Sequence, residues 1–282
     1  MSKKYEFTGE TKEFNGRILR RIKRMKDGLI GGWIETEKNL SHSGGCFVYD
    51  ESMVYDNGVV CGNGKVFDNG KVFGNGKVFD NGEVYDNGEV YDNGKVYGNG
   101  EVCDNGIVYG NGKVYGNGMV YDNGIVYGNG MVCGYGIVRD YGMVCGYGVV
   151  CDSGKVFDNG RVFGNGRVLG NGKVFNNGIL CGDGEVYGNG IVFGNGKVFK
   201  GKIIGEVSLP YKNIFQYQCE NRVLTAILTE DDEILYSIGC QSNITKEQFL
   251  DRIYNEEGGL ENNPHREEYL RLIPLVEMYF GK

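Results

Sequence analysis

The chain contains two histidines, His42 and His265, and imidazole is the side chain most often used as a general base near neutral pH. His42 lies in the polar segment 40–43, and His265 follows Asn263-Pro264 at the start of a predicted helix. A single histidine in a loop or in the first turn of a helix is usually a surface or capping residue. We therefore predict no catalytic residue, and keep these two histidines as the candidates should the protein be an enzyme.

Seven aspartates follow one another at a constant spacing of 18 residues: Asp50, Asp68, Asp86, Asp104, Asp122, Asp140 and Asp158. If 18 residues make one turn of a repetitive fold, these carboxylates form a column at about 4.8 Å spacing and repel one another. We favour the interpretation that each carboxylate accepts a hydrogen bond from backbone N–H groups at its corner. Bound cations, or a linear anionic surface that imitates a nucleic-acid backbone, are the alternatives.

Six of the nine cysteines stand in a position of the sequence pattern that otherwise holds Tyr or Phe: Cys61, Cys103, Cys133, Cys145, Cys151 and Cys181. We interpret them as small hydrophobic residues and not as a disulfide framework. This usage, together with the polar N-terminal residues, predicts a location in a reducing cytoplasm. No zinc-type cysteine spacing and no run of 18 apolar residues occur, so we expect no metal, no cofactor and no membrane span.

The net charge of −7 is distributed unevenly, and residues 1–45 hold the one basic cluster. Its members are Arg17, Arg20, Arg21, Lys23, Arg24 and Lys26. A solvated strand face is our main interpretation, and a nucleic acid or another anionic partner is the alternative. Because no part of the chain is strongly basic, nucleic acid is not the partner that we expect.

The elements that must position these residues come from a six-residue repeat over residues 46–204. Its unit reads Gly-x-Val-(Tyr/Phe)-(Asp/Gly)-Asn, and we name the six positions the Gly slot, the outward slot, the anchor, the aromatic slot, the Asp/Gly slot and the Asn slot. Valine anchors recur at every sixth position from Val48 to Val198, with Leu180 as the one substitute and Ile204 continuing the series. Such repeats build a β-solenoid in which each unit supplies a short strand and a turn.

Strand alternation assigns the faces of this solenoid. The outward slot holds mostly Lys, Glu or Arg and must face solvent, so the Gly slot and the anchor face inward. The aromatic slot should face outward again, with its rings stacked coil upon coil. We expect the Asn slot to adopt the left-handed backbone conformation that a tight corner needs. The 18-residue period of the aspartates predicts three sides, and nine coils make a prism about 43 Å long.

The middle of the repeat departs from this charged pattern. Its outward slots are apolar, and tyrosine replaces three residues of the Asn slot; we call these ten residues the apolar belt: Ile107, Met119, Ile125, Met131, Tyr135, Ile137, Tyr141, Met143, Tyr147 and Val149. A contiguous exposed apolar patch usually marks an interaction surface. The open alternatives are burial against a second copy or against the protein's own C-terminal part, contact with another macromolecule, or silent variation among repeat copies.

The ends of a solenoid expose unpaired strand edges and need covering. Residues 1–45 are predicted to form an N-terminal β cap with a hairpin turn at Asn15-Gly16. Residues 205–282 are predicted to form a small α+β domain. Its expected strands are 215–219, 223–229 and 234–239, and its expected helices run from the capping box at Thr245 to about Asn255 and from Pro264 to about Phe280. The apolar face of the second helix is Tyr269, Leu272, Ile273, Val276 and Tyr279.

The pattern Gly-x-Val-x-x-Asn resembles that of left-handed β-helix hexapeptide proteins, with Gly where that family usually has Ala, Ser, Thr or Val. The segments 31–35, 39–41 and 46–50 are similar to the N-terminal part of the YdcK-like hexapeptide-repeat proteins of bacteria and phages, which are often labelled transferases. The resemblance covers about residues 5–204 and implies a mainly β, left-handed parallel β-helix. Left-handed β-helix acyltransferases use a histidine base between subunits and commonly carry a projecting loop. Here the coils contain neither.

Three functions remain after these observations. We favour a non-enzymatic β-solenoid scaffold that binds protein through the apolar belt and the C-terminal domain, by self-association, with a macromolecular partner, or both. The resemblance to phage proteins adds a specific hypothesis, an inhibitor of a host defence complex acting in the host cytoplasm. The second function is a hexapeptide acyltransferase-like enzyme using His42 or His265 at a subunit junction. The third is an anionic nucleic-acid mimic acting through the aspartate column.

Overall fold

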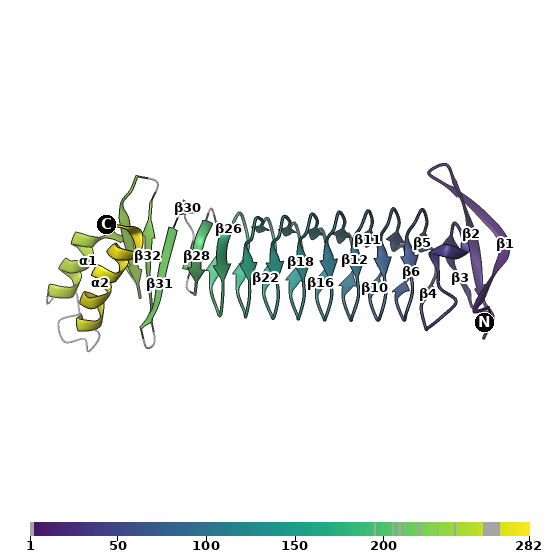
Figure 1. The fold of residues 1–282 in the computed structure, drawn as a ribbon, viewed down its shortest axis with the longest axis horizontal. Coiled ribbons are helices and arrows are strands. Elements are labelled where there is room, and N and C mark those ends of the chain that lie inside the picture. The colour runs from purple at the N-terminus through teal and green to yellow at the C-terminus, as the bar shows by residue number, and fades with distance from the viewer. Residues whose placement is uncertain are drawn as a thin grey trace.

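The protein is an elongated rod in which a β-solenoid separates an N-terminal β cap from a C-terminal α+β part (Figure 1). The computed structural model describes residues 3–194, 196–204, 206–207, 210–211, 213–219, 222–229, 231–239, 241–255 and 266–282. The chain termini lie at opposite ends of the rod. The predicted mainly β fold, a parallel solenoid of about nine coils with a small C-terminal sheet and helices, is confirmed.

Strands of two residues stack in three parallel series, which we call the first, second and third faces. The first face is a ten-stranded sheet of β4 (Phe47–Val48), β7 (Lys65–Val66), β10 (Glu83–Val84), β13 (Glu101–Val102), β16 (Met119–Val120), β19 (Ile137–Val138), β22 (Lys155–Val156), β25 (Lys173–Val174), β27 (Ile191–Val192) and β29 (Glu206–Val207). The second face contains β5 (Met53–Val54), β8 (Lys71–Val72), β11 (Glu89–Val90), β14 (Ile107–Val108), β17 (Ile125–Val126), β20 (Met143–Val144) and β23 (Arg161–Val162). The third face contains β6 (Val59–Val60), β9 (Lys77–Val78), β12 (Lys95–Val96), β15 (Lys113–Val114), β18 (Met131–Val132), β21 (Val149–Val150) and β24 (Arg167–Val168).

The valine anchors explain why these strands stack in register. Every anchor from Val48 to Val198 is completely buried in one continuous core cluster. Each strand pairs in parallel with the strand 18 residues later, as Val84 pairs with Val102. Because this pairing is in register, every outward slot lies directly above the outward slot of the previous coil. The side chains of both slots point away from the core, since side chains alternate along a strand.

The Gly slot is glycine because the backbone of the next coil occupies the space of a side chain. A Cβ on Gly76 would lie 2.4 Å from the carbonyl oxygen of Val90, and similar approaches recur at the other glycines of this slot. Ser52 is the serine that occupies this slot, and its hydroxyl lies within hydrogen-bond distance of the carbonyl oxygens of Tyr49 and Val66. The departure from the Ala, Ser, Thr or Val of the resembled family therefore has a steric cause.

The left-handed corner residue is in the Asp/Gly slot, and the prediction that it is the Asn slot is wrong. Positive φ values recur through this slot, for example 49° at Asp86 and 63° at Gly98. Asp and Asn tolerate this conformation better than other non-glycine residues do. The Asn slot instead forms side-chain ladders between coils, in which Asn63 donates to Asn81 at 3.2 Å and Asn81 donates to Asn99 at 3.2 Å.

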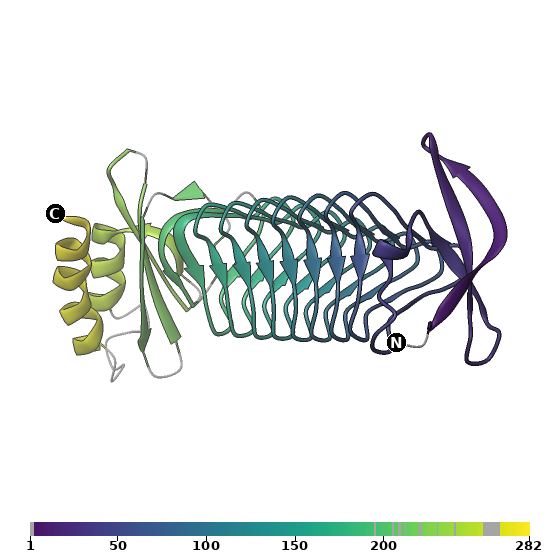
Figure 2. The ribbon, with the colours of Figure 1, turned by 45° about the vertical axis from the view of Figure 1, so that its right-hand side comes forward.

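The N-terminal cap is a twisted hairpin that continues into the solenoid register (Figure 2). Its elements are β1 (Tyr5–Phe14), β2 (Arg17–Arg24), β3 (Ile30–Ile34) and the short 3₁₀ helix η1 (Glu37–Asn39). The turn at Asn15-Gly16 has positive φ at both residues, as predicted for a tight hairpin turn. Strand β3 pairs in parallel with β5, and Leu40 forms a bridge with Val60.

The last coils differ from the others because the corner between the second and third faces straightens. The chain there runs as long strands, β26 (Ile179–Val186) and β28 (Lys197–Ile203), followed by β30 (Pro210–Tyr211). Val186 pairs with Ile203, which is fully buried, while Ile204 is half-buried. The prediction that Ile204 continues the anchor series is wrong by one residue, because the register shifts between Leu180 and Asp183.

The C-terminal part closes the far end of the solenoid. Its antiparallel sheet contains β31 (Asn213–Cys219), β32 (Arg222–Leu228), β33 (Ile234–Ile238) and β34 (Gln241–Thr245), and it is followed by α1 (Lys246–Tyr254) and α2 (Arg266–Phe280). Ile214 and Ile227 join the solenoid core from this sheet. The capping box at Thr245 is confirmed. The predicted apolar face of α2 is buried at Tyr269, Leu272, Ile273 and Val276, while Tyr279 lies at its edge, 47% exposed with its ring against Phe215. Among the described helices, none is long and apolar enough to cross a membrane.

Candidate interaction surface

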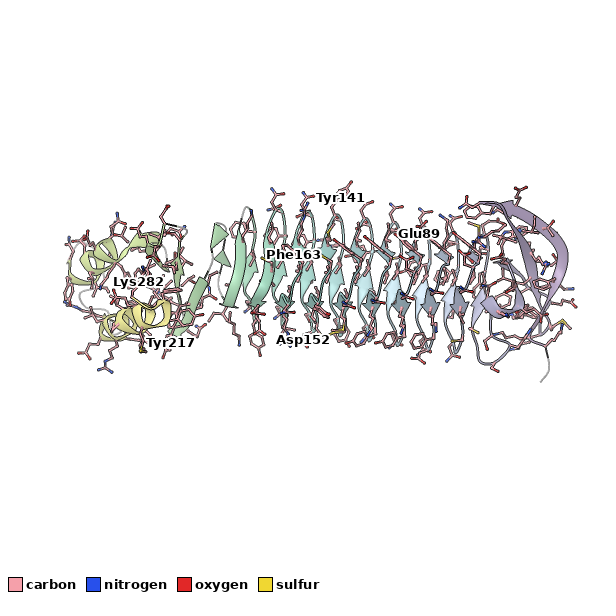
Figure 3. All side chains as sticks on the ribbon, turned by 45° about the horizontal axis from the view of Figure 1, so that its top comes forward. Glu89, Tyr141, Asp152, Phe163, Tyr217 and Lys282 are labelled. Carbon is pink, nitrogen blue, oxygen red and sulfur yellow. A yellow bond between two sulfur atoms is a disulfide. The ribbon has the colours of Figure 1, made fainter. Side chains whose placement is uncertain are left out.

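The apolar belt encircles the middle of the solenoid. Tyr135, Tyr141 and Tyr147 are 67%, 66% and 65% exposed and stand in three consecutive Asn slots, so each of the three edges of one coil carries one tyrosine. Tyr141 projects from the rim of the rod in Figure 3. The seven outward-slot members are half-buried, because the side chains of the coils above and below flank them. The tyrosines are therefore the most accessible members of the apolar belt.

The seven outward-slot residues of the belt are divided among all three faces. The first face holds Met119 and Ile137, which are paired neighbours. The second holds Ile107, Ile125 and Met143 in three successive strands. The third holds Met131 and Val149. No described residue of the chain covers these strips from outside, since the C-terminal domain contacts the last coils and not the middle ones. Burial of the belt against that domain, one of the sequence-based alternatives, is therefore wrong.

Outside the belt, the outward slot stabilises the stack through opposite charges. Lys65 Nζ lies 2.7 Å from Glu83 Oε1 on the first face, and Lys71 Nζ lies 2.8 Å from Glu89 Oε1 on the second. The aromatic slot adds stacked rings, as predicted; Tyr91, Tyr109 and Tyr127 form one such stack with centroid distances of 5.1 and 5.0 Å. These contacts occur within one chain. The apolar outward slots of the belt form no such ion pairs.

Two of the belt coils are linked covalently. Cys133 and Cys151 occupy the aromatic slot of the third face in adjacent coils, and a disulfide joins them across a Cα–Cα distance of 4.6 Å. The interpretation of the coil cysteines as small hydrophobic residues is therefore wrong for this pair. The interpretation agrees with the other four coil cysteines, which are free: Cys61, Cys103, Cys145 and Cys181. Burial raises the pKa of the Cys103 thiol to about 11. Because two cysteines of the belt coils form a disulfide, cysteine usage in these coils does not support the predicted reducing compartment.

The aspartate column lies at the corner that follows the first face. The carboxylate of Asp50 accepts a hydrogen bond from the backbone N–H of Asp68 in the next coil, at 3.3 Å. Burial, and then the neighbouring Asp104 and Asp68, raise the pKa of Asp86. Asp56 and Asp152, outside the column, make the same backbone contact to the next coil. Among the described residues, no group of three or more His, Cys, Asp or Glu side chains is placed to hold a metal ion.

The basic cluster of the cap is largely paired with acids of the same chain. Arg17 contacts Glu35 and Asp56, Arg21 contacts Glu10 and Glu51, Lys23 contacts Glu6, and Arg24 contacts Asp27. The Arg20 guanidinium lies over the ring of Phe7. A cluster whose charges are neutralised in this way favours the interpretation as a strand face.

His42 lies beside a pocket of about 660 Å³ at the N-terminal end, which Lys3, Lys4, Lys26 and Cys46 also line. Its ring stacks on Tyr5, and its Nδ1 accepts a hydrogen bond from the backbone N–H of Lys4 at 3.2 Å. A neutral ring whose Nδ1 accepts carries its proton on Nε2. The Nε2 atom is buried and makes no hydrogen bond to the described residues, so no second group orients this ring as the partner of a general base does. His265 lies outside the described residues.

A second pocket, of about 430 Å³, lies in the C-terminal domain and was not singled out from the sequence. Charged residues of both signs surround it, including Lys246, Glu277 and Lys282. Lys246 pairs with Glu277, and Lys282 pairs with Asp232. Burial raises the pKa of Tyr236, which also lines the pocket, to about 12. These side chains are distant in the sequence, and no motif connects them.

No protein-family model matches this chain, and no curated protein sequence matches it. The fold is that of a hexapeptide-repeat β-solenoid.

Proposed function

We propose that this protein is a non-enzymatic scaffold that binds protein through its apolar belt. The observation that carries the proposal is the ring of Tyr135, Tyr141 and Tyr147, each about two-thirds exposed, in slots where the rest of the solenoid is mostly Asn. Tyrosine is enriched at protein interfaces because it combines a large apolar ring with a hydroxyl that can be hydrogen-bonded. Asparagine in the same slots would have continued the ladders that stabilise the coils.

The C-terminal domain offers a second surface for the same function. Leu275, Met278 and Tyr279 of α2 are 46%, 69% and 47% exposed and lie within five residues on the outer part of the rod. A rod with a central apolar belt, and with exposed apolar residues on a helix at one end, suits a scaffold that holds partners at separated positions. An inhibitor of a host defence complex, as suggested by the resemblance to phage proteins, is a specific case of this proposal.

The test replaces one belt methionine on each face with lysine, the commonest residue of the outward slot. The variant Met119→Lys/Met131→Lys/Met143→Lys should fold, because lysine occupies the same slot in many coils. The control is Ile179→Lys/Ile191→Lys, which also replaces apolar residues with lysine, at two half-buried outward slots outside the belt. Light scattering gives the mass of each variant, and affinity capture from the native cell compares the bound proteins.

The proposal predicts that the belt variant loses mass, captured protein or both, while the control behaves as the wild type. Unchanged mass together with unchanged capture would remove the belt as the binding surface. The acyltransferase-like alternative is tested separately. Binding of an acyl-CoA, measured by calorimetry and lost in His42→Ala, would replace the scaffold proposal with an enzymatic one.

A further inference from the structure

The outward slots of the first face carry an ordered series of charges on both sides of the belt. From β10 to β25, six successive strands place Glu83, Glu101, Met119, Ile137, Lys155 and Lys173 in one in-register column. The column therefore reads as two acids, two apolar residues and two bases. Charged residues at equal distances on either side of the midpoint between Met119 and Ile137 therefore have opposite charges.

This order places like charges next to each other within the chain. Glu83 pairs directly with Glu101, and Lys155 pairs directly with Lys173. Like charges opposite one another on adjacent strands are destabilising. Opposite charges are neighbours at other places, as Arg167 and Glu185 are at 2.9 Å on the third face, and Glu83 itself also contacts Lys65 of the preceding coil at 2.7 Å. The third face holds a second run of like charges, Lys77, Lys95 and Lys113. Among the described residues no ion pair is recorded for either lysine of the column, so these two charges have no partner within one chain.

We propose that the first face binds a second copy of this chain, with the two solenoid axes antiparallel. A two-fold axis that lies in the interface and passes between Met119 and Ile137 places each acid of one copy opposite a base of the other. Glu101 faces Lys155 of the second copy, Glu83 faces Lys173, and Met119 faces Ile137. Each contact occurs twice, which gives four opposite-charge contacts around a central apolar strip. This assignment rests on the proposed function and names the partner of one belt face.

The neighbouring aromatic slots agree with this arrangement. The same axis places Tyr121 of one copy opposite Arg139 of the other, and Arg139 is the one arginine in the aromatic slots of the solenoid. Within one chain its guanidinium lies 4.9 Å from the centroid of the Phe157 ring and 2.6 Å from Asp140 Oδ2, so the contact with Tyr121 of the second copy adds to these two. An arginine over a tyrosine ring is a favourable cation–π pair. The aspartate column would lie at the rim of the interface, where water and salt screen its repulsion. Six coils at about 4.8 Å each give a strip about 29 Å long, which suits an interface at the smaller end of the stable range.

The other two faces fit a second copy less well. On the third face an equivalent axis between Met131 and Val149 sets Lys113 opposite Arg167, which repel, and Lys95 opposite Glu185, which attract. On the second face it gives one complementary pair, Glu89 with Arg161. A parallel arrangement about an axis along the solenoid would set Glu83 opposite Glu83 and Lys173 opposite Lys173, and it is excluded by the same repulsion.

Charge reversal tests this interface without endangering the fold. Glu101→Lys places a lysine opposite Lys155 of the second copy, and we expect it to raise the dimer dissociation constant by about 10-fold or more. The double variant Glu101→Lys/Lys155→Glu should restore the wild-type value. Within one chain both changes convert like-charge neighbours into opposite-charge neighbours. Glu101→Lys also removes the hydrogen bond that Tyr85 donates to Glu101 at 3.0 Å, and because the double variant lacks the same bond, recovery of the dimer there separates this loss from the charge effect. Lys95→Glu on the third face is the matched control. Sedimentation velocity supplies the dissociation constants.

Cysteine cross-linking fixes the orientation. Positions 83 and 173 are five coils apart in one chain, so Glu83→Cys/Lys173→Cys can cross-link only between copies, and Glu83→Cys alone should not cross-link in the antiparallel arrangement. A monomeric wild type, a dimer indifferent to Glu101→Lys, or a dimer cross-linked by Glu83→Cys alone would each overturn this inference. In any of these cases the loss of captured protein by the belt variant would still support the proposed function, so the two can fail separately.

Discussion

The carbonyl oxygen of Val120 lies 2.4 Å from the point where a Cβ on Gly106 would stand. The same approach recurs along the solenoid and disfavours a side chain in the Gly slot; the exceptions, Cys46 and Ser52, lie in the first coil. A single methyl group should therefore be costly there. Gly106→Ala is expected to destabilise the protein by about 2–3 kcal/mol, because the overlap forces the backbone of two coils apart. Urea unfolding followed by circular dichroism measures the effect, with Lys113→Ala as the control. A Gly106→Ala variant as stable as this control would contradict the account of the slot.

The stacked rings of the second face should contribute measurably to stability. Tyr109 lies between Tyr91 and Tyr127 and contacts both. Tyr109→Ala removes two ring contacts and is expected to cost about 1–3 kcal/mol of unfolding free energy. Tyr109→Phe should keep most of the stability, because a phenylalanine ring stacks equally well at Phe175 between Phe157 and Phe193. Equal losses of unfolding free energy in the two variants would show that the stabilisation comes from the hydroxyl and not from ring stacking.

The disulfide between Cys133 and Cys151 closes a loop of 18 residues. Chain-entropy arguments assign such a loop about 3 kcal/mol, so a reducing agent should lower the melting temperature of the wild type. Cys151→Ser should melt at the reduced value and show no further response to reductant. Cys61→Ser, at a free cysteine, is the control. Recovery of both Cys133 and Cys151 as alkylated thiols from unreduced, unfolded protein would contradict the bond.

The raised pKa of Asp86 predicts how stability depends on pH. Its causes are burial and then the carboxylates of Asp104 and Asp68. An acid with a higher pKa in the folded than in the unfolded chain binds its proton more readily when folded. The folded state therefore loses stability as pH rises from the ordinary value of 3.8 through the raised pKa. Asp86→Asn should stabilise the protein at neutral pH, since Asn176 adopts the same left-handed conformation in this column.

Thermal melts of Asp86→Asn and the wild type at several pH values check this prediction. The advantage of the variant should shrink as pH falls and vanish once the wild-type carboxylate is protonated. Asp92→Asn is the control, because the residues 18 positions before and after Asp92 are Gly74 and Gly110. An advantage that is independent of pH would argue that the effect does not arise from charge.

The regular part of the fold could be predicted because period and chemistry coincide there. Valine anchors at a spacing of six and aspartates at a spacing of 18 determine the inward direction and the number of sides. The corner conformation could not be assigned in this way, since Asp and Asn are adjacent in the unit and both tolerate positive φ. Ile203 and Ile204 are chemically equivalent, so only the pairing with Val186 shows which one is inward. Strand β34 was missed because its sequence Gln241–Thr245 lacks apolar alternation.

The belt was recognisable as a departure from the repeat, but its internal order was not. The sequence lists its outward slots one after another, whereas the fold distributes them over three faces. Only the column of 18-residue neighbours brings Glu101 beside Met119 and separates it from Ile107. The disulfide likewise follows from two cysteines that are 18 residues apart and therefore stacked.

Hydroxyl-radical footprinting of the protein in its native assembly, read out by mass spectrometry, tests the binding role of the belt most directly. In the isolated chain Tyr135, Tyr141 and Tyr147 are more exposed than Tyr187, which is 45% exposed. If protein covers the belt, at least one belt tyrosine should be modified more slowly than Tyr187 in the assembly, and this reversal should disappear in the Met119→Lys/Met131→Lys/Met143→Lys variant. If all three belt tyrosines are instead modified faster than Tyr187 in the native assembly, the belt is bare and the proposed function is wrong.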